Sequence, residues 1–240
     1  MRPEPVSDAA SEAWSRLLHP AVAHRGLWSA KGPPENSLAA FEAAVDAGYG
    51  IELDVRLSAD GEAMVFHDES LERMARRQGP LARHSAAELA AMRLHDTDQP
   101  IPTLREVLAR VDGRALVHVE LKTRPGEEGP LDEAVAEVFA AYDGPVAVIG
   151  FNALSHAWWA RNQPGFLRGL DCREQGRLAE AAGIGRPHFL ALSAEMLTSE
   201  PAQAARGAGF PILAWTLRSA ARAAEVAPFC DNLIFEGFLP

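Results

Sequence analysis

The sequence predicts an α/β fold, a (β/α)8 TIM barrel, on three observations. Short apolar runs typical of buried strands alternate with helical patterns along most of the chain, which indicates a parallel sheet. Counting the runs around Val22 and Ile51 gives eight strands, the number at which such a sheet closes into a barrel. The length of 240 residues and the 48% hydrophobic content suit one barrel, so residues 1–240 are expected to form a single domain.

The predicted elements follow in order along the chain. Residues 7–18 have the pattern of a short helix, with Ser7 as N-cap and Ala10, Trp14, Leu17 and Leu18 on one side. We expect this N-terminal segment, residues 1–20, to plug the bottom of the barrel. A helix over residues 37–48 follows the first strand and ends at a glycine. Later strands are predicted at 115–122, 146–151, 167–171, 189–193, 212–217 and 232–236, and helices at 103–111, 131–142, 154–162, 174–182, 201–208 and 220–227.

An insertion, residues 55–102, interrupts the alternation after the second strand. Only five residues separate Leu57 from Ala63. A parallel crossover needs about a dozen, so residues 55–67 are expected to form an antiparallel hairpin that turns at Asp60-Gly61. Residues 69–102 lack a strand pattern and are interpreted as a lid above the barrel. Its basic side chains are interpreted as solvated: Arg73, Arg76, Arg77, Arg83, His84 and His95.

The predicted second strand carries two acids on one face. As a strand, residues 49–57 place Glu52, Asp54 and Arg56 on one side and the apolar residues on the other. Two carboxylates on a buried face repel each other, and each takes a raised pKa unless a cation lies between them. The alternative is an exposed edge strand with a polar face.

A third acid comes from the strand at 115–122, where Glu120 and Lys122 share a face. Glu52, Asp54 and Glu120 together suit one divalent cation, Mg²⁺ or Ca²⁺, because hard cations prefer carboxylate oxygens to nitrogen or sulfur. The alternative for Glu120 is an internal salt bridge with Lys122 or Arg25.

Two histidines are expected to face the same cation. His24 ends the apolar run of the first strand, and the hairpin returns His67 to the level of the acids. Imidazoles titrate near neutral pH and can serve as general base and general acid, although a lone histidine is more often structural. His118, one layer deeper than the acids, is interpreted as a hydrogen-bonded core residue.

The charge and cysteine content exclude several classes of protein. A formal net charge of −10 argues against a nucleic-acid surface or a polybasic membrane patch, so an anionic substrate must be attracted by local cations. The two cysteines, Cys172 and Cys230, form neither a disulfide framework nor a metal-binding spacing. With no export signal and no long apolar stretch in the sequence, the expected location is the cytoplasm and no membrane span is expected.

Five short motifs in order resemble those of the glycerophosphodiester phosphodiesterase family, within the PLC-like phosphodiesterase superfamily. They are His24-Arg25-Gly26, Pro34-Glu35-Asn36-Ser37, Glu52 with Asp54, His67-Asp68, and Glu120 with Lys122. The resemblance extends from about residue 21 to about residue 237. Trp215-Thr216 also resembles a W-T pair of the family, whereas Phe235-Glu236 stands where many members have T-D, and no ligand role is assigned to Glu236.

The resemblance implies hydrolysis of a small glycerophosphodiester to glycerol phosphate and an alcohol such as choline or ethanolamine, in lipid and glycerol metabolism. His24 and His67 would be the catalytic acid and base, in an order that the sequence leaves open. The attack would come from water or, through a cyclic phosphate, from a substrate hydroxyl. The other implied roles are metal ligation by Glu52, Asp54 and Glu120, substrate binding by Arg25, Lys122 and Trp215, and support of the site by Glu35, Asn36 and Asp68. Glu35 has a second interpretation as a favourable charge at a helix N-terminus.

Two other functions remain open from the sequence. A lysine at the end of a barrel strand, here Lys122, can form a Schiff base with a carbonyl substrate, as in aldolase-type lyases. The altered final strand and lid also allow a non-catalytic barrel that binds phosphodiesters. Neither the alcohol group, the choice between Mg²⁺ and Ca²⁺, nor the oligomeric state follows from the sequence.

Overall fold

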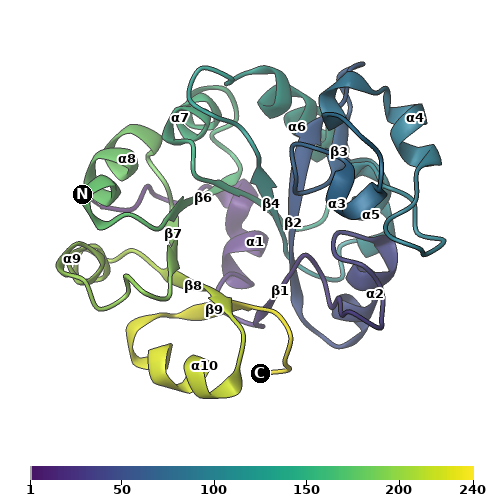
Figure 1. The fold of residues 1–240 in the computed structure, drawn as a ribbon. Helices are drawn as coiled ribbons and strands as arrows, with labels where there is room; N and C mark the ends of the chain where they lie inside the picture. The colour runs from purple at the N-terminus through teal and green to yellow at the C-terminus, as the bar shows by residue number, and fades with distance from the viewer. Residues whose placement is uncertain (1) are drawn as a thin grey trace.

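Eight parallel strands close into a barrel in the computed structural model, which describes residues 2–240. Closure is made by β1 (Val22–His24), which pairs in parallel with β2 (Gly50–Leu57) on one side and with β9 (Asn232–Phe235) on the other. Figure 1 looks along the barrel, with the helices arranged around the strands. The predicted (β/α)8 barrel is therefore confirmed. The remaining barrel strands are β4 (Val117–Leu121), β5 (Val146–Gly150), β6 (Leu167–Cys172), β7 (Phe189–Ser193) and β8 (Ile212–Leu217).

Helices connect consecutive strands of the barrel, and several of them begin at a capping residue that can be recognised in the sequence. The side chain of Ser37 accepts a hydrogen bond from the Ala40 amide at the start of α2, and Thr103 forms a capping box with Glu106 at the start of α5. The helices between barrel strands are α2 (Leu38–Asp46), α5 (Leu104–Val111), α6 (Pro130–Ala140), α7 (Ala153–Asn162), α8 (Leu178–Gly185), α9 (Glu200–Gly207) and α10 (Ala220–Val226). Short 3₁₀ turns, η3 (Gln175–Arg177) and η4 (Ala227–Phe229), adjoin α8 and α10.

The alternation of side chains along β2 separates the core from the site. Ile51, Leu53 and Val55 are fully buried and belong to the main hydrophobic core that β2 shares with the surrounding helices. Glu52 and Asp54 lie on the opposite face of the strand. The interpretation of β2 as an exposed edge strand was therefore wrong, because β1 and β4 flank it on both sides.

The N-terminal segment closes one end of the barrel, as predicted, but its helix is shorter than expected. It consists of a 3₁₀ turn, η1 (Asp8–Ala10), and α1 (Ser11–Ser15). Leu17 is fully buried in a cluster with strand residues such as Ala147 and Phe189. Two details were wrong: Leu18 is 46% exposed, and the Ser7 hydroxyl donates to the Gly165 carbonyl 3.1 Å away instead of capping the turn.

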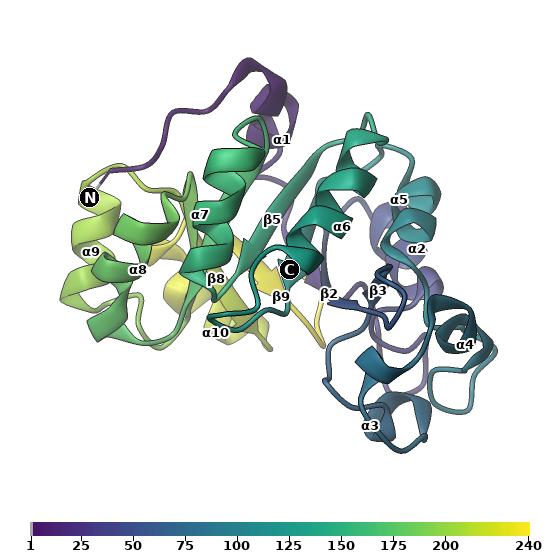
Figure 2. The same ribbon diagram turned by 90° about the horizontal axis from the view of Figure 1, so that it is seen from above.

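The predicted hairpin and insertion lie at the opposite end from α1, as Figure 2 shows. The short strand β3 (Ala63–Val65) pairs antiparallel with the end of β2, and Val55 lies opposite Val65. The lid that follows contains α3 (Glu72–Ala75), η2 (Leu81–Arg83) and α4 (Ala86–Ala91). It has a hydrophobic cluster of its own that includes Phe66, Leu71 and Leu89. None of the helices described between residues 2 and 240 is long and apolar enough to cross a membrane.

Candidate active site

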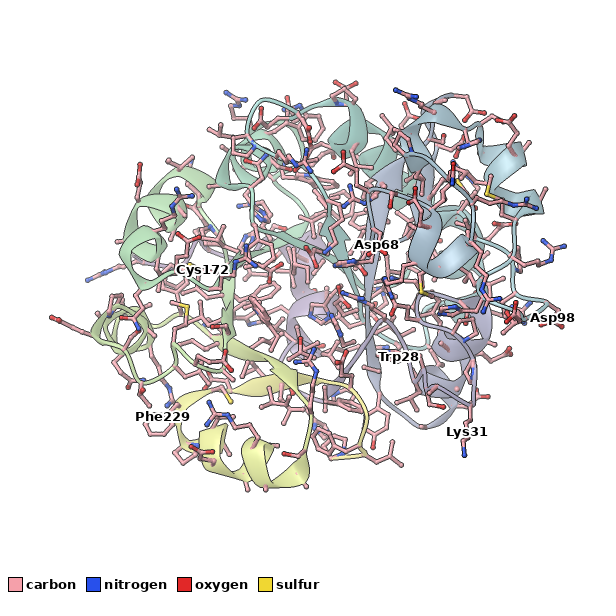
Figure 3. The ribbon with its side chains drawn as sticks, viewed as in Figure 1. Trp28, Lys31, Asp68, Asp98, Cys172 and Phe229 are labelled. Carbon is pink, nitrogen blue, oxygen red and sulfur yellow. The ribbon has the colours of Figure 1, made fainter. Side chains whose placement is uncertain are left out.

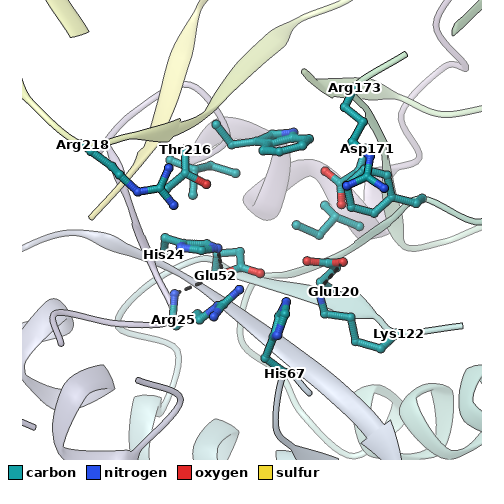
Figure 4. Close-up of a pocket in the computed structure, with 14 residues that line it drawn as sticks. His24, Arg25, Glu52, His67, Glu120, Lys122, Asp171, Arg173, Thr216 and Arg218 are labelled. Carbon is teal, nitrogen blue, oxygen red and sulfur yellow. Dashed lines mark hydrogen bonds and ion pairs between the residues drawn. The ribbon is translucent and has the colours of Figure 1, made fainter. Parts of the chain in front are cut away.

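A cavity of about 220 Å³ opens at the carboxyl ends of the barrel strands, where barrel enzymes place their chemistry. Its wall is formed by side chains from almost every strand and from the hairpin, and Figure 4 shows labelled ones such as His24, Glu52, His67 and Glu120 around the cavity. The residues that line it are His24, Arg25, Glu52, His67, Glu120, Lys122, Ile149, Phe151, Asp171, Arg173, Trp215, Thr216, Arg218 and Ile234.

The three acids predicted to bind a metal converge beside this cavity. Glu52, Asp54 and Glu120 each offer a carboxylate oxygen, and these oxygens lie within 4.8 Å of one another. Adjacent strands bring them together, because Asp54 of β2 is in register with Glu120 of β4. Glu52 and Glu120 line the cavity, whereas Asp54 is fully buried beneath it.

Two basic side chains contact the acids directly. Lys122 Nζ lies 2.6 Å from Glu120 Oε1 and 2.8 Å from Asp54 Oδ1. Arg25 Nε lies 3.1 Å from Asp54 Oδ2, and the Arg25 amide donates to Glu52 Oε2 at 3.1 Å. The salt bridge between Glu120 and Lys122 is thus present together with the carboxylate cluster, and the two interpretations do not exclude each other.

The acids differ in how burial and charge act on them. Burial raises the pKa of Glu52 well above its usual value, and the neighbouring carboxylates of Asp54 and Glu120 raise it further. Burial also raises the pKa of Glu120 to about 7, against the opposing effect of Lys122. For Asp54, burial acts in the same direction, but Lys122 and Arg25 outweigh it and hold its pKa far below the usual range. The cluster therefore carries more negative charge than its two cations offset at alkaline pH.

Each of the two predicted catalytic histidines is held by a carboxylate at Nδ1. His24 Nδ1 lies 2.6 Å from Glu236 Oε2, and its Nε2 lies 3.9 Å from Glu52 Oε2. His67 Nδ1 lies 2.7 Å from Asp68 Oδ1. A carboxylate at Nδ1 fixes the orientation of the ring and leaves Nε2 available for proton transfer. Burial lowers the pKa of His67, which favours its neutral form near pH 7.

A side chain of the lid, Arg73, contacts both Asp68, which holds His67, and Glu35, which contacts Arg25. Arg73 donates from Nε to Asp68 Oδ2 at 2.6 Å, and from Nη2 to Glu35 Oε1 at 2.7 Å. Glu35 in turn accepts from Arg25 Nη1 at 2.8 Å. Arg73 is about half exposed, as expected for a lid residue, but it also pairs with two acids of the site. Glu35 is therefore the acid shared by Arg25 and Arg73. Figure 3 shows Asp68 near the middle of the view along the barrel, whereas Lys31 and Asp98 lie at the periphery.

The backbone after β1 bends sharply to make these contacts. Asn36, with a φ of +56°, donates from Nδ2 to Asp54 Oδ2 at 2.7 Å and so orients that buried acid. Gly26 has a φ of +81°, and a Cβ at this position would lie 2.7 Å from the Ala40 carbonyl carbon. Only glycine fits there, which explains the glycine that follows His24-Arg25.

Aromatic side chains form one wall of the cavity. The rings of Phe151 and Trp215 pack edge to face with centroids 5.6 Å apart. Phe151 is 45% exposed, so its ring borders the cavity and is not part of the buried core. His118 is fully buried as expected, but neither ring nitrogen has a hydrogen-bond partner among residues 2–240, and burial lowers its pKa to about 4. It is a neutral core residue packed against Phe189.

Four residues of the site were not assigned a role from the sequence. Asp171 and Glu236 stand at strand ends, a position that marks them as candidates, but no motif identified their partners. Burial raises the pKa of Asp171, and Glu120 adds to the effect. Arg173 and Arg218 come from the loops after β6 and β8, where helix and strand periodicity carries no signal.

Comparisons with known proteins identify the family and the fold of the chain. The chain matches the Glycerophosphoryl diester phosphodiesterase family over residues 24–165, more than half of its length. A glycerophosphodiester phosphodiesterase from Caldanaerobacter subterraneus is 35% identical over 146 residues, which are 56% of this chain and 58% of that protein. The chain therefore spans under two thirds of this curated relative.

Two solved structures share the fold over nearly the whole chain. A phosphodiesterase from Oleispira antarctica, in complex with the product sn-glycerol-3-phosphate, superposes with a TM-score of 0.81 at 26% identity and covers 93% of this chain and 94% of its own. A glycerophosphodiester phosphodiesterase from Thermotoga maritima gives 0.75 at 29% identity, with 90% and 94% covered. The ordered motifs, the barrel and the family match lead to one conclusion: this chain belongs to the glycerophosphoryl diester phosphodiesterase family.

Proposed function

We propose that this protein is a metal-dependent phosphodiesterase that hydrolyses glycerophosphodiesters to glycerol phosphate and an alcohol. The observation that carries the proposal is the pair of imidazoles, His24 and His67, each oriented by a carboxylate at Nδ1 beside one carboxylate cluster. Family membership supports the choice of substrate, and the Oleispira antarctica relative was solved with sn-glycerol-3-phosphate as its product.

The carboxylate cluster fits a hard divalent cation such as Mg²⁺ or Ca²⁺. Glu52 Oε1 is buried and has no hydrogen-bond partner among the described residues, which leaves an oxygen free for a ligand. Two permanently charged side chains, Arg25 and Lys122, contact the three acids. When bound, the metal would neutralise the excess charge and polarise a phosphoryl oxygen. Glu52, Asp54 and Glu120 are the residues that would hold it.

The chain's own groups supply the remaining requirements of phosphodiester cleavage. One imidazole takes the proton from the attacking hydroxyl, of water or of the substrate, and the other donates a proton to the departing alcohol through Nε2. The carboxylates of Glu236 and Asp68 hold the rings and stabilise the imidazolium form. Arg25 and Lys122 offer their remaining N–H groups to the phosphate oxygens, and the ring of Trp215 lines the same cavity.

The alternative functions have less support. Burial by itself would lower the pKa of Lys122, but Asp54 and Glu120 outweigh it and raise that pKa above the usual value. An amine held as an ammonium ion is a poor nucleophile, which disfavours Schiff-base chemistry. A barrel that only binds phosphodiesters would have no need for two imidazoles that are both oriented by acids.

A direct assay tests the proposal. The protein is incubated with a panel of glycerophosphodiesters and Mg²⁺, Ca²⁺ or EDTA, and released glycerol phosphate is measured. We expect turnover that EDTA abolishes and that His24→Ala and His67→Ala each lower by roughly 10²-fold or more. The exposed His95→Ala serves as a histidine control with wild-type rates. Turnover in EDTA, or near wild-type rates in either site variant, would contradict the proposal.

A further inference from the structure

One cation of the cavity, Arg173, has no acidic partner among the residues that the structure describes. Arg25 contacts Glu35 and Asp54, Lys122 contacts Asp54 and Glu120, and Arg218 contacts Glu236. By contrast, Arg173 forms no ion pair and no side-chain hydrogen bond with any residue from 2 to 240. Its charge is therefore available to a ligand, which is notable in a chain with a net charge of −10.

An aromatic ring places this free cation at the cavity. The Arg173 guanidinium carbon lies 5.6 Å from the centroid of Phe151, over the ring. Phe151 is in turn packed against Trp215, so the guanidinium rests on a rigid aromatic wall. Arg173 follows β6 directly, and Figure 4 shows it on the opposite side of the cavity from His67.

The same contact disfavours a cationic substrate group at this wall. A choline or ethanolamine group is bound through the face of an aromatic ring, where the negative π-density attracts a cation. Here the face of Phe151 is occupied by a guanidinium, which would also repel a second cation. The expectation of choline or ethanolamine as the alcohol therefore does not suit this wall.

We propose that Arg173 selects glycerophosphodiesters whose alcohol part carries a second anionic group, a phosphate or a carboxylate. The inference rests on the proposed function and specifies its substrate class. With the scissile phosphate between the two histidines, the alcohol part extends along the Phe151 and Trp215 wall, and its anionic group meets the guanidinium. Arginine suits this role because its planar N–H fork binds phosphate and carboxylate oxygens in pairs.

The experiment compares three substrates that differ in the charge of the alcohol. They are glycerophosphocholine, the neutral glycerophosphoglycerol, and glycerophosphoglycerol with a terminal phosphate monoester. Steady-state kcat/KM is measured from the substrate consumed, with each substrate in the presence of the activating metal, because the phosphorylated diester releases two molecules of glycerol phosphate for each bond cleaved. We expect the wild-type protein to favour the phosphorylated substrate over the neutral one by roughly tenfold, and glycerophosphocholine to be the poorest.

Two variants test whether the preference depends on Arg173. Arg173→Gln is expected to lower kcat/KM for the phosphorylated substrate by about tenfold, with a far smaller effect on the neutral one, and Arg173→Lys to retain part of the preference. Arg177→Gln is the matched control: Arg177 is exposed, pairs with Glu174 and lies outside the cavity, so the preference should persist.

The possible outcomes separate this inference from the proposed function. Equal or greater activity on glycerophosphocholine, or an Arg173→Gln variant that slows all three substrates equally, would overturn the role of Arg173 while leaving a phosphodiesterase. If none of the three diesters were hydrolysed with either metal, the proposed function itself would fail.

Discussion

Replacing Glu236 with glutamine isolates the role of the carboxylate that holds His24. The Glu236 side chain is 11% exposed and has two partners: Oε2 lies 2.6 Å from His24 Nδ1, and Oε1 accepts from Arg218 Nε at 2.6 Å. A glutamine amide has one acceptor oxygen and one donor NH₂ group. Since Arg218 requires the acceptor, the NH₂ group would face His24 and force Nδ1 to accept, which moves the ring proton to Nε2.

The size of the expected loss follows from this contact. A hydrogen bond to a charged group contributes about 1.5 to 3 kcal/mol, equivalent to roughly 10- to 10²-fold in rate if it is lost in the transition state. The wrong ring tautomer adds to the loss, and in serine proteases the comparable Asp to Asn change lowers kcat by about 10⁴-fold. We therefore expect Glu236→Gln to lower kcat by between about 10² and 10⁴-fold, with KM little changed.

A second substitution separates tautomer control from a general disturbance. The double variant combines Glu236→Gln with Arg218→Ala, so no arginine at position 218 competes for the amide oxygen. The amide can then turn this oxygen toward His24 Nδ1, and part of the lost kcat should return. The assay is steady-state release of glycerol phosphate, with circular dichroism to confirm that each variant is folded. The reasoning would be refuted if Glu236→Gln kept at least half of the wild-type kcat. It would also be refuted if the double variant were slower than Glu236→Gln alone.

The same carboxylate also affects stability in acid. Burial would raise the pKa of Glu236, but His24 and Arg218 outweigh it and lower the pKa to about 2, so the ionised form stabilises the fold. This contribution is present above about pH 4.5, the ordinary value, and is lost as the pH falls toward 2. Denaturant titrations should show a steeper loss of stability over this range in the wild type than in Glu236→Gln.

Three further predictions concern the metal, the lid and the N-terminal plug. Because the pKa of Glu120 is raised to about 7, protons compete with a metal ion for its carboxylate at low pH. Mg²⁺ or Ca²⁺ should therefore raise Tm more at pH 8 than at pH 5. An equal rise in Tm at both pH values would contradict this prediction. Arg73→Ala should lower kcat/KM by roughly tenfold or more because it releases both acids of the lid network, whereas Arg76→Ala, an exposed lid control, should retain wild-type activity. Leu17→Ala should lower the free energy of unfolding by about 2 to 5 kcal/mol in urea titrations, and the half-exposed Leu18→Ala by under about 1 kcal/mol; similar values for both would show that the plug is not packed.

Much of the fold could be predicted because local signals agree with it. The eight strands, the hairpin at Asp60-Gly61 and the capping boxes at Ser85 and Thr103 all depend on residues close in sequence. The helix over 7–18 was overestimated, because its apolar spacing suits a 3₁₀ turn and one short helix as well as a single longer helix.

The sequence predicted those residues of the candidate site that lie at strand ends or within the short motifs. Alternation along β2 places Glu52 and Asp54 on one face, and parallel pairing with β4 brings Glu120 beside them. Their roles in metal binding and catalysis remain predictions. The contacts of Arg73 and the exposure of Phe151 were missed because they arise between segments far apart in the chain.

The sequence by itself determined the barrel, its family and the residues that gather at its mouth, because strand periodicity and short motifs are local properties. Only the tertiary structure decided which partners these residues have. It paired His24 with Glu236, which is 212 positions away, through the contact of the first strand with the last. It also left Arg173 without an acidic partner among the described residues, because barrel closure and loop packing set distances between charges that no local pattern specifies.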